Sequence, residues 1–273
     1  AGGGVSTTSP DMDIDNTIIW NNRDNTGTDT ADASISGAAA INYSLIQGQV
    51  PAGIGNLDGT NPANNPLFVV PVDPATAPST SGILSVKYGS PIVDAGDNTA
   101  IAGVTLDLAG NPRIYNSIVD MGAYELQLAC PPPETTRLYV DHTASGNNTG
   151  TSWLDALEDL RDAFTLADDC AGIVEVWVAQ GVYRPDEGVG MVPDSRTETY
   201  RLVDGVAVYG GFDGTEVALE ERDWQNQSTV LSGDVDRNDI NVGNIVLDPA
   251  NIRGDNSYHV VIASGTGDTA ILD

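Results

Sequence analysis

The sequence predicts an all-β protein built as a parallel β-solenoid, whose chain winds into coils that stack on one another. Its apolar runs are short and β-branched, with Gly, Asn and Asp between them. Taking Val176, Val206, Val230 and Val260 as strand centres gives steps of 30, 24 and 30 residues. Such a spacing suits one coil, which buries its apolar face only by stacking on the next. The alternative is an antiparallel sandwich, whose strands recur about every 8–12 residues.

Two runs in the first half share one pattern, in which Asn precedes a short apolar run that ends in Asn or Gly. These are NTIIWNN (16–22) and INYSLIQG (41–48), and Asn16 and Asn42 are 26 residues apart. Asn and Gly suit the positive-φ corners between the faces of a coil. In the second half, four further segments are predicted as strands: 174–183, 205–212, 228–234 and 258–265.

One short α-helix is predicted near residues 152–168, because its apolar residues recur at helical spacing. Ser152 and Asp155 suggest a capping box at its start. A helix before the first strand of a solenoid can cover the open end, where unpaired strand edges would otherwise invite aggregation. The apolar face consists of Trp153, Leu157, Leu160, Phe164 and Ala167.

The three prolines after Cys130 favour an extended polyproline conformation and mark a semi-rigid linker. The predicted division is therefore 1–129, a linker at 130–136, and 137–273. Cys130 and Cys170 are the only two cysteines, and neither has metal-type spacing. They are candidates for one disulfide, which would contribute about 4 kcal/mol on the chain-entropy estimate. The sequence leaves open whether they meet.

Several stretches resemble bacterial secreted β-helix proteins of the choice-of-anchor Q domain type, which are related to polymorphic outer-membrane-protein and pectate-lyase-like solenoids. GSPIVDAGDN, TLDLAGNPRI and VDMGAYE resemble the C-terminal end of such a domain. RLYVDHTASGNNTGTSWLDAL, VEVWVAQGVYRP, YRLVDGVAVYGGFDGTE, ERDWQNQSTVLSGDVD and DNSYHVV resemble its N-terminal end. The resemblance implies a right-handed parallel β-helix, with a C-terminal-type portion (1–129) preceding an N-terminal-type portion (137–273). It implies architecture and no particular chemistry.

The order of these two portions is reversed relative to that family. The interpretation is a slice of a tandem array, or a repeating unit whose last coil stacks on the first coil of the next copy. Either arrangement gives head-to-tail growth, because an open solenoid end is a template for another strand.

The chain is strongly acidic, with 39 Asp and Glu against 11 Lys and Arg and a net charge of −28. This charge disfavours nucleic acid and anionic membranes as partners. No apolar run reaches the roughly 18–20 residues of a membrane span. An acidic surface attracts divalent cations; the alternative is that it only keeps a secreted bacterial protein soluble.

Two acidic clusters are candidate Ca²⁺ sites, because they offer oxygen ligands without His or Cys. In PDMDID, Asp11, Asp13 and Asp15 share one face of an extended segment. The alternative for this segment is a solvated edge. The second cluster resembles the start of an EF-hand loop, but an Asp replaces its glycine and Ile245 its bidentate Glu, which excludes that motif. This cluster consists of Asp234, Asp236, Asn238 and Asp239.

Catalysis finds little support in the sequence. No GxSxG, HExxH or phosphate-binding loop is present. His142 and His259 are expected to be structural. Three acidic residues, Asp94, Asp97 and Asp107, are expected to cap turns. Trp20 and Trp224 stay open as sugar-stacking candidates, whereas Trp153 and Trp177 are expected in the core.

The sequence therefore predicts a non-enzymatic structural unit of a bacterial extracellular fibre, sheath or large surface adhesin. Its expected partners are copies of itself, joined head to tail, with glycans or the cell surface as further partners and Ca²⁺ as a stabilising ion. The alternative is a secreted β-helix protein that binds or cleaves carbohydrate.

Overall fold

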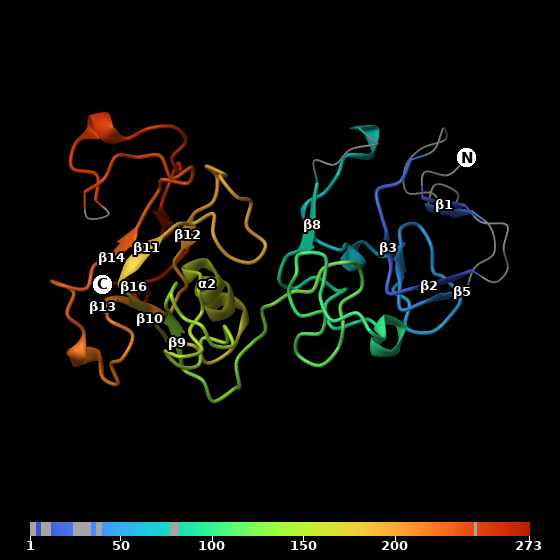
Figure 1. Ribbon diagram of the computed structural model, residues 1–273, viewed down its shortest axis with the longest axis horizontal. Coiled ribbons are helices and arrows are strands. Elements are labelled where there is room, and N and C mark those ends of the chain that lie inside the picture. Colours follow the sequence, from blue (N-terminus) through green and yellow to red (C-terminus); the bar gives the residue numbers. More distant parts are fainter. Residues whose placement is uncertain (1–3, 7–11, 24–33, 37–39, 77–81, 243–244) are drawn as a thin grey trace. The chain divides into compact units, whose positions relative to one another are not determined.

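A computed structural model describes residues 4–6, 12–23, 34–36, 40–76, 82–242 and 245–273 of the chain. The chain forms two units, unit 1 (Ala1–Gln127) and unit 2 (Leu128–Asp273), each with its own strands and core (Figure 1). The metal-ligand candidate Asp11 lies outside the described residues.

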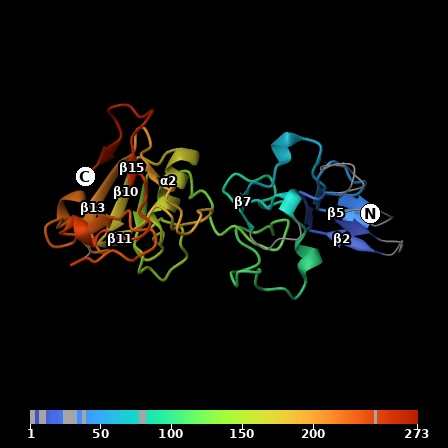
Figure 2. The same cartoon turned by 90° about the horizontal axis from the view of Figure 1, so that it is seen from above.

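Unit 1 pairs its first six strands in parallel, as three two-stranded sheets, of which Figure 2 shows β2 beside β5. The strands are β1 (Val5–Ser6), β2 (Asp13–Asp15), β3 (Ile18–Ile19), β4 (Ile35–Ser36), β5 (Ala40–Asn42) and β6 (Leu45–Ile46). The pairs are β1–β4, β2–β5 and β3–β6, so three consecutive strands lie against the next three. β7 (Phe68–Val70) and β8 (Ile83–Val86) form an antiparallel pair.

The register of these pairs differs by one residue from the expected repeat. Asn42 faces Asp15 rather than Asn16, which makes the repeat 27 residues instead of 26. Asn16 and Tyr43 are the corner residues, with φ of 48° and 45°. The corner after β5 is therefore made by a tyrosine, and Asn42 is the last residue of the strand before it.

Alternate residues of these strands enter two separate cores, as the two-residue period of a strand requires. Ile19 and Ile46 point into one core together with Ile14, Ile35 and Ile41. Their neighbours Ile18 and Leu45 point to the other face, where Val86, Ile92 and Met121 cover them. Residues after β6 thus cover the outer face of the β3–β6 sheet.

Unit 2 contains a four-stranded parallel sheet in the order β16–β13–β10–β9 and two parallel pairs, β11–β14 and β12–β15 (Figure 1). The strands are β9 (Arg137–Val140), β10 (Glu175–Ala179), β11 (Gly181–Tyr183), β12 (Tyr200–Arg201), β13 (Ala207–Phe212), β14 (Thr229–Leu231), β15 (Val261–Ile262) and β16 (Ile271–Leu272). Short 3₁₀ helices span Pro62–Asn64, Pro74–Thr76, Asn98–Ile101, Leu219–Glu221 and Pro249–Asn251.

The four residues used as centres of the sequence repeat lie in or just before strands of three different sheets, so that repeat was wrong for unit 2. Val176 faces Val208, whereas Val230 faces Val182. Val260 precedes β15, which pairs with β12. Each of the three sheets of unit 2 contains apolar runs. The 24–30-residue steps therefore connected runs that belong to different sheets. Facing residues in β10 and β13 are 32 positions apart, as in Val176 and Val208.

The helix α2 (Leu160–Asp169) begins eight residues later than expected. Ser152 and Asp155 do bond each other, with the Asp155 amide donating to the Ser152 hydroxyl (3.1 Å), but Asp155 also accepts from Asn147 (2.8 Å). These bonds close a loop instead of starting a helix. Trp153 consequently lies outside α2 and packs edge-on against Tyr139, with 4.8 Å between ring centroids.

The predicted linker is attached to unit 2. Cys130 and Cys170 form a disulfide with a Cα–Cα distance of 5.7 Å, and Cys170 is the C-cap of α2. The carbonyl of Thr136 accepts a hydrogen bond from the amide of Val174 (2.9 Å). The proline segment thus packs as part of unit 2 and is not a free spacer.

Candidate functional site

The first predicted cation cluster is only partly visible, because Asp11 lies outside the described residues. Asp13 and Asp15 lie on β2, where Asp13 is exposed and Asp15 half-buried. The Asn42 side-chain amide donates to Asp15 (3.2 Å). The Asp15 carboxylate is thus hydrogen-bonded to a neutral side-chain amide on the neighbouring strand.

The second predicted cluster does come together, in the loop after β14. Asp234 accepts from the backbone amides of Asn238 (2.9 Å) and Asp239 (3.3 Å). Asp236 accepts from the Asn238 side chain (2.6 Å) and the Asp255 amide (2.8 Å). These bonds shape the loop without an ion, although Asp236 keeps one buried oxygen with no partner in the described part of the chain. In all the residues that the structure describes, no three Asp, Glu, His or Cys side chains are arranged to hold a metal.

A cluster of acids that the sequence did not single out lies around the start of α2. Asp162 is 2% exposed and accepts a hydrogen bond from the Val189 amide (2.8 Å). Burial raises the pKa of Asp162 to about 7, and the nearby charge of Asp159 adds to this rise. Burial also raises the pKa of Asp159 itself to about 6, reinforced by Glu187 and Glu158. Nearby, the buried Asp186 pairs with Arg237 (3.4 Å).

Lowering the pH from 8 to 5 is expected to raise the free energy of unfolding of unit 2. The folded pKa values of about 6 and 7 exceed the ordinary value of 3.8, so the folded state binds protons first as the pH falls. The stabilisation is complete below the ordinary pKa of 3.8 and is lost as the pH rises from there through the two folded values. The gain in unfolding free energy of the isosteric variant Asp162→Asn should be larger at pH 8 than at pH 5 by at least about 1.4 kcal/mol, the equivalent of one pKa unit. Urea denaturation at both pH values measures this, and a gain that is equal at both would contradict it.

Unit 1 holds a buried ion pair within the stretches that carry the family resemblance. Arg113 and Glu125 are bonded at 2.8 Å, with side chains 6% and 1% exposed. Glu125 also accepts from the amides of Tyr115 (2.8 Å) and Asp120 (2.9 Å). Asp120 in turn accepts from the amide of Asp94 (2.7 Å). This network connects three separate loops, so the buried charges of Arg113, Glu125 and Asp120 have a structural role.

Two of the three acidic residues expected to cap turns do so. The Asp97 carboxylate accepts from the Thr99 amide (2.8 Å) at the start of a 3₁₀ helix. Asp107 accepts from the Asn111 amide (2.8 Å). Asp94 differs, because its side chain accepts from the distant Asn116 amide group (3.2 Å).

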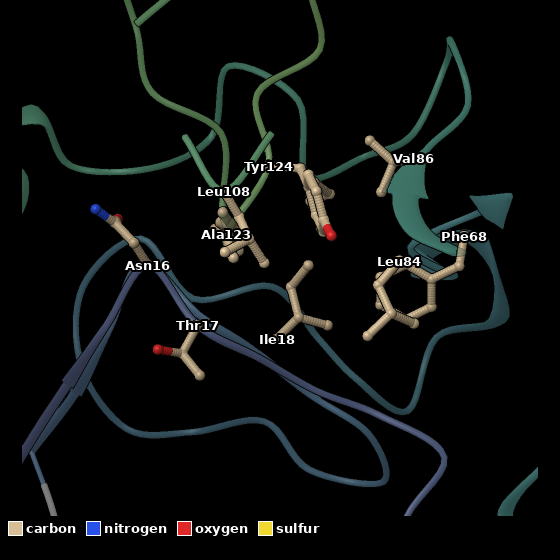
Figure 3. A pocket seen from close by; sticks show the side chains of 12 residues that line it. Asn16, Thr17, Ile18, Phe68, Leu84, Val86, Leu108, Ala123 and Tyr124 are labelled. Carbon is tan, nitrogen blue, oxygen red and sulfur yellow. The ribbon is translucent and has the colours of Figure 1, made fainter. Parts of the chain in front are cut away.

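An apolar pocket of about 420 Å³ opens in unit 1 beside the β7–β8 pair (Figure 3). Figure 3 shows Phe68, Leu84 and Val86 on one side of it and Leu108 on the other. The side chain of Asn16, which also lines it, is bonded to the backbone of Asp97 at 2.7 and 2.9 Å. The pocket therefore offers mainly apolar surface, and the Asn16 side chain in it is already bonded within the protein.

The histidines and tryptophans are not gathered at one site. His142 is exposed and its ring meets Tyr183 edge-on at 5.6 Å; His259 is exposed elsewhere in unit 2. Trp177 is fully buried, as expected from its apolar run. Trp20 is half-buried in unit 1, whereas Trp224 is 63% exposed.

One end of the parallel sheets in unit 2 is uncovered within the described residues. β14, β15 and β16 each have a single strand neighbour there. A cavity of about 400 Å³ opens at this end and is lined by inward-facing Val178, Val208 and Leu272, together with Trp224 and Ile245. The opposite end is covered, because Leu157 bridges β9 at Val140 and α2 packs beside it.

No helix of the described segments is long and apolar enough to cross a membrane. Comparison of the chain with protein-family models, curated proteins and solved structures finds no match.

Proposed function

We propose that the chain is a non-enzymatic structural unit of a bacterial extracellular fibre, sheath or large surface adhesin. The proposed architecture is a right-handed parallel β-helix in both units. Its support is the pairing of three consecutive strands with the next three in unit 1, and of β10, β11 and β12 with β13, β14 and β15 in unit 2. Stacked coils produce this order of parallel pairs.

The observation that carries the proposal is the uncovered end of unit 2. Unpaired strand edges and exposed apolar core surface are a template for a further parallel strand. Two apolar side chains that line the cavity at this end are exposed, Ile245 at 50% and Leu272 at 46%. A further coil, from the next repeat or from another copy of the chain, would cover them in head-to-tail growth.

Two further features fit an extracellular setting. Disulfides such as Cys130–Cys170 persist in oxidising compartments outside the cytoplasm. The net charge of −28 is offset by divalent cations, and Ca²⁺ is the proposed ion because the available ligands are carboxylate and amide oxygens. Asp13, Asp15 and the loop Asp234–Asp239 are the proposed contacts.

The chain is expected to form oligomers that grow with protein concentration in the presence of Ca²⁺, and to give filaments by electron microscopy. Leu272→Lys places a charge in the uncovered end and should abolish assembly at concentrations where the wild type assembles. Val217→Lys is the matched control, because Val217 is 81% exposed elsewhere in unit 2 and its replacement should leave assembly intact.

Light scattering after size-exclusion chromatography measures both variants. Strictly monomeric wild-type protein at high concentration with Ca²⁺ would contradict the proposal. Replacing Ca²⁺ with a chelator tests the ion separately. Unchanged assembly and an unchanged melting temperature would rule out a role for Ca²⁺ but would not contradict assembly by end stacking.

A further inference from the structure

A polar groove lies where three neighbouring strands of the large sheet in unit 2 end. Asp141 and His142 directly follow β9, Gln180 follows β10, and Asp213 follows β13. Because neighbouring strands lie about 4.8 Å apart, these residues form a row across the sheet. They line a space of about 690 Å³ together with Arg184 and Asn226.

The backbone of the groove is held by local hydrogen bonds. Asp141 accepts from both the amide and the hydroxyl of Thr143 at 2.8 Å. Asp213 accepts from the amide (3.1 Å) and the hydroxyl (2.6 Å) of Thr215. A Cβ at Gly181 would lie 2.5 Å from the His142 ring, so the chain passes close to this side chain at Gly181. The groove is thus formed before any ligand enters.

Several polar groups in the groove remain available to a ligand. Gln180 and Ser228 are exposed, and their side chains make no hydrogen bond within the described residues. Arg184 is oriented by a bond from its Nε to the Asp234 carbonyl (2.8 Å) and by an ion pair with Glu187 (3.4 Å). Carboxylates, amides, a hydroxyl and a guanidinium therefore present donors and acceptors side by side.

This mixture selects among ligand classes. Anionic ligands are disfavoured by Asp141 and Asp213 and by the net charge of −28. A metal ion is disfavoured by the guanidinium of Arg184 and by the lack of three suitably placed metal-binding side chains among the described residues. Hydroxyl groups, which both donate and accept, match the free groups best.

We propose that this groove binds a neutral saccharide across the ends of β9, β10 and β13. The site goes beyond the proposed structural role, because it would hold a saccharide and not a further strand; Gln180 lines this groove and not the cavity at the uncovered end, whereas Ser228 lines both. A fibre built from this chain would carry one such groove in every copy.

Calorimetric titration of the full chain with cellohexaose, xylohexaose, mannohexaose and hexagalacturonate tests the proposal. At least one neutral hexasaccharide should bind. Gln180→Ala should raise the Kd of that saccharide about threefold to tenfold, the effect of one lost hydrogen bond. Gln225→Ala is the matched control, because Gln225 is exposed in the turn before β14 and does not line the groove. Its Kd should equal that of the wild type.

Ser228→Ala provides a second test from another strand, with the same expected direction. The proposal is overturned if none of the neutral hexasaccharides binds at millimolar concentration, or if hexagalacturonate binds equally well. It is also overturned if Gln180→Ala and Gln225→Ala have the same Kd, since the saccharide would then bind elsewhere. The result for Gln180→Ala is independent of whether the chain forms filaments, because Gln180 does not line the cavity at the uncovered end.

Discussion

Replacing Arg113 with Met is expected to lower the free energy of unfolding of unit 1 by about 3–5 kcal/mol. The substitution leaves the Glu125 carboxylate buried without its opposite charge, which is the costly way to break a buried ion pair. The guanidinium also donates to the carbonyls of Asp120 (3.2 Å) and Gly122 (2.7 Å), and these bonds are lost as well. Urea denaturation, followed at the transition of unit 1, measures the effect.

The matched control is Arg23→Met, which removes an exposed arginine from the same unit and should change stability by less than about 0.5 kcal/mol. The double variant Arg113→Met with Glu125→Gln should be less destabilised than Arg113→Met alone, because no uncompensated charge remains. Equal losses for Arg113→Met and Arg23→Met would show that the pair does not hold the loops together.

Removing the disulfide by Cys130→Ser with Cys170→Ser is expected to destabilise unit 2 by about 4 kcal/mol. The bond closes a loop with a sequence separation of 40 residues, and a loop of this length restricts the unfolded chain by about that amount. Thermal unfolding of the variant and of reduced wild-type protein should agree. The transition of unit 1 is the internal control and should not move, whereas a loss under about 1 kcal/mol in unit 2 would contradict the expectation.

Sequence periodicity located many strands but did not determine how they pair. The run around Val176 contains β10, and the run at 41–48 contains β6 and all of β5 except its first residue. Each of these strands pairs in parallel within its own unit: β10 with β13, β5 with β2, and β6 with β3. The β-helix itself stays a proposal. Pairing was mis-assigned in unit 2 because Val176 and Val230 are both apolar strand residues on different faces, a distinction that spacing alone does not carry.

The helix and the buried charges show two other limits of sequence reasoning. Leu157 fits the helical pattern, yet it bridges β9 at Val140, and this tertiary contact outweighs local propensity. Arg113 and Glu125 are ordinary charged residues in the sequence, and only the fold removes both from water. The predicted calcium residues Asp234 and Asp236 are close in sequence and in space, but backbone amides already occupy part of their carboxylates.

The disulfide at the entrance to unit 2 has a mechanical consequence. Tension that reaches unit 2 through the segment before Cys130 passes directly across the sulfur–sulfur bond to Cys170. The covalent path therefore bypasses β9 and α2, which lie between the two cysteines. If the chain were pulled as part of a fibre, the backbone between the two cysteines would carry no load while the disulfide is intact. Extension would begin in the strands that follow Cys170.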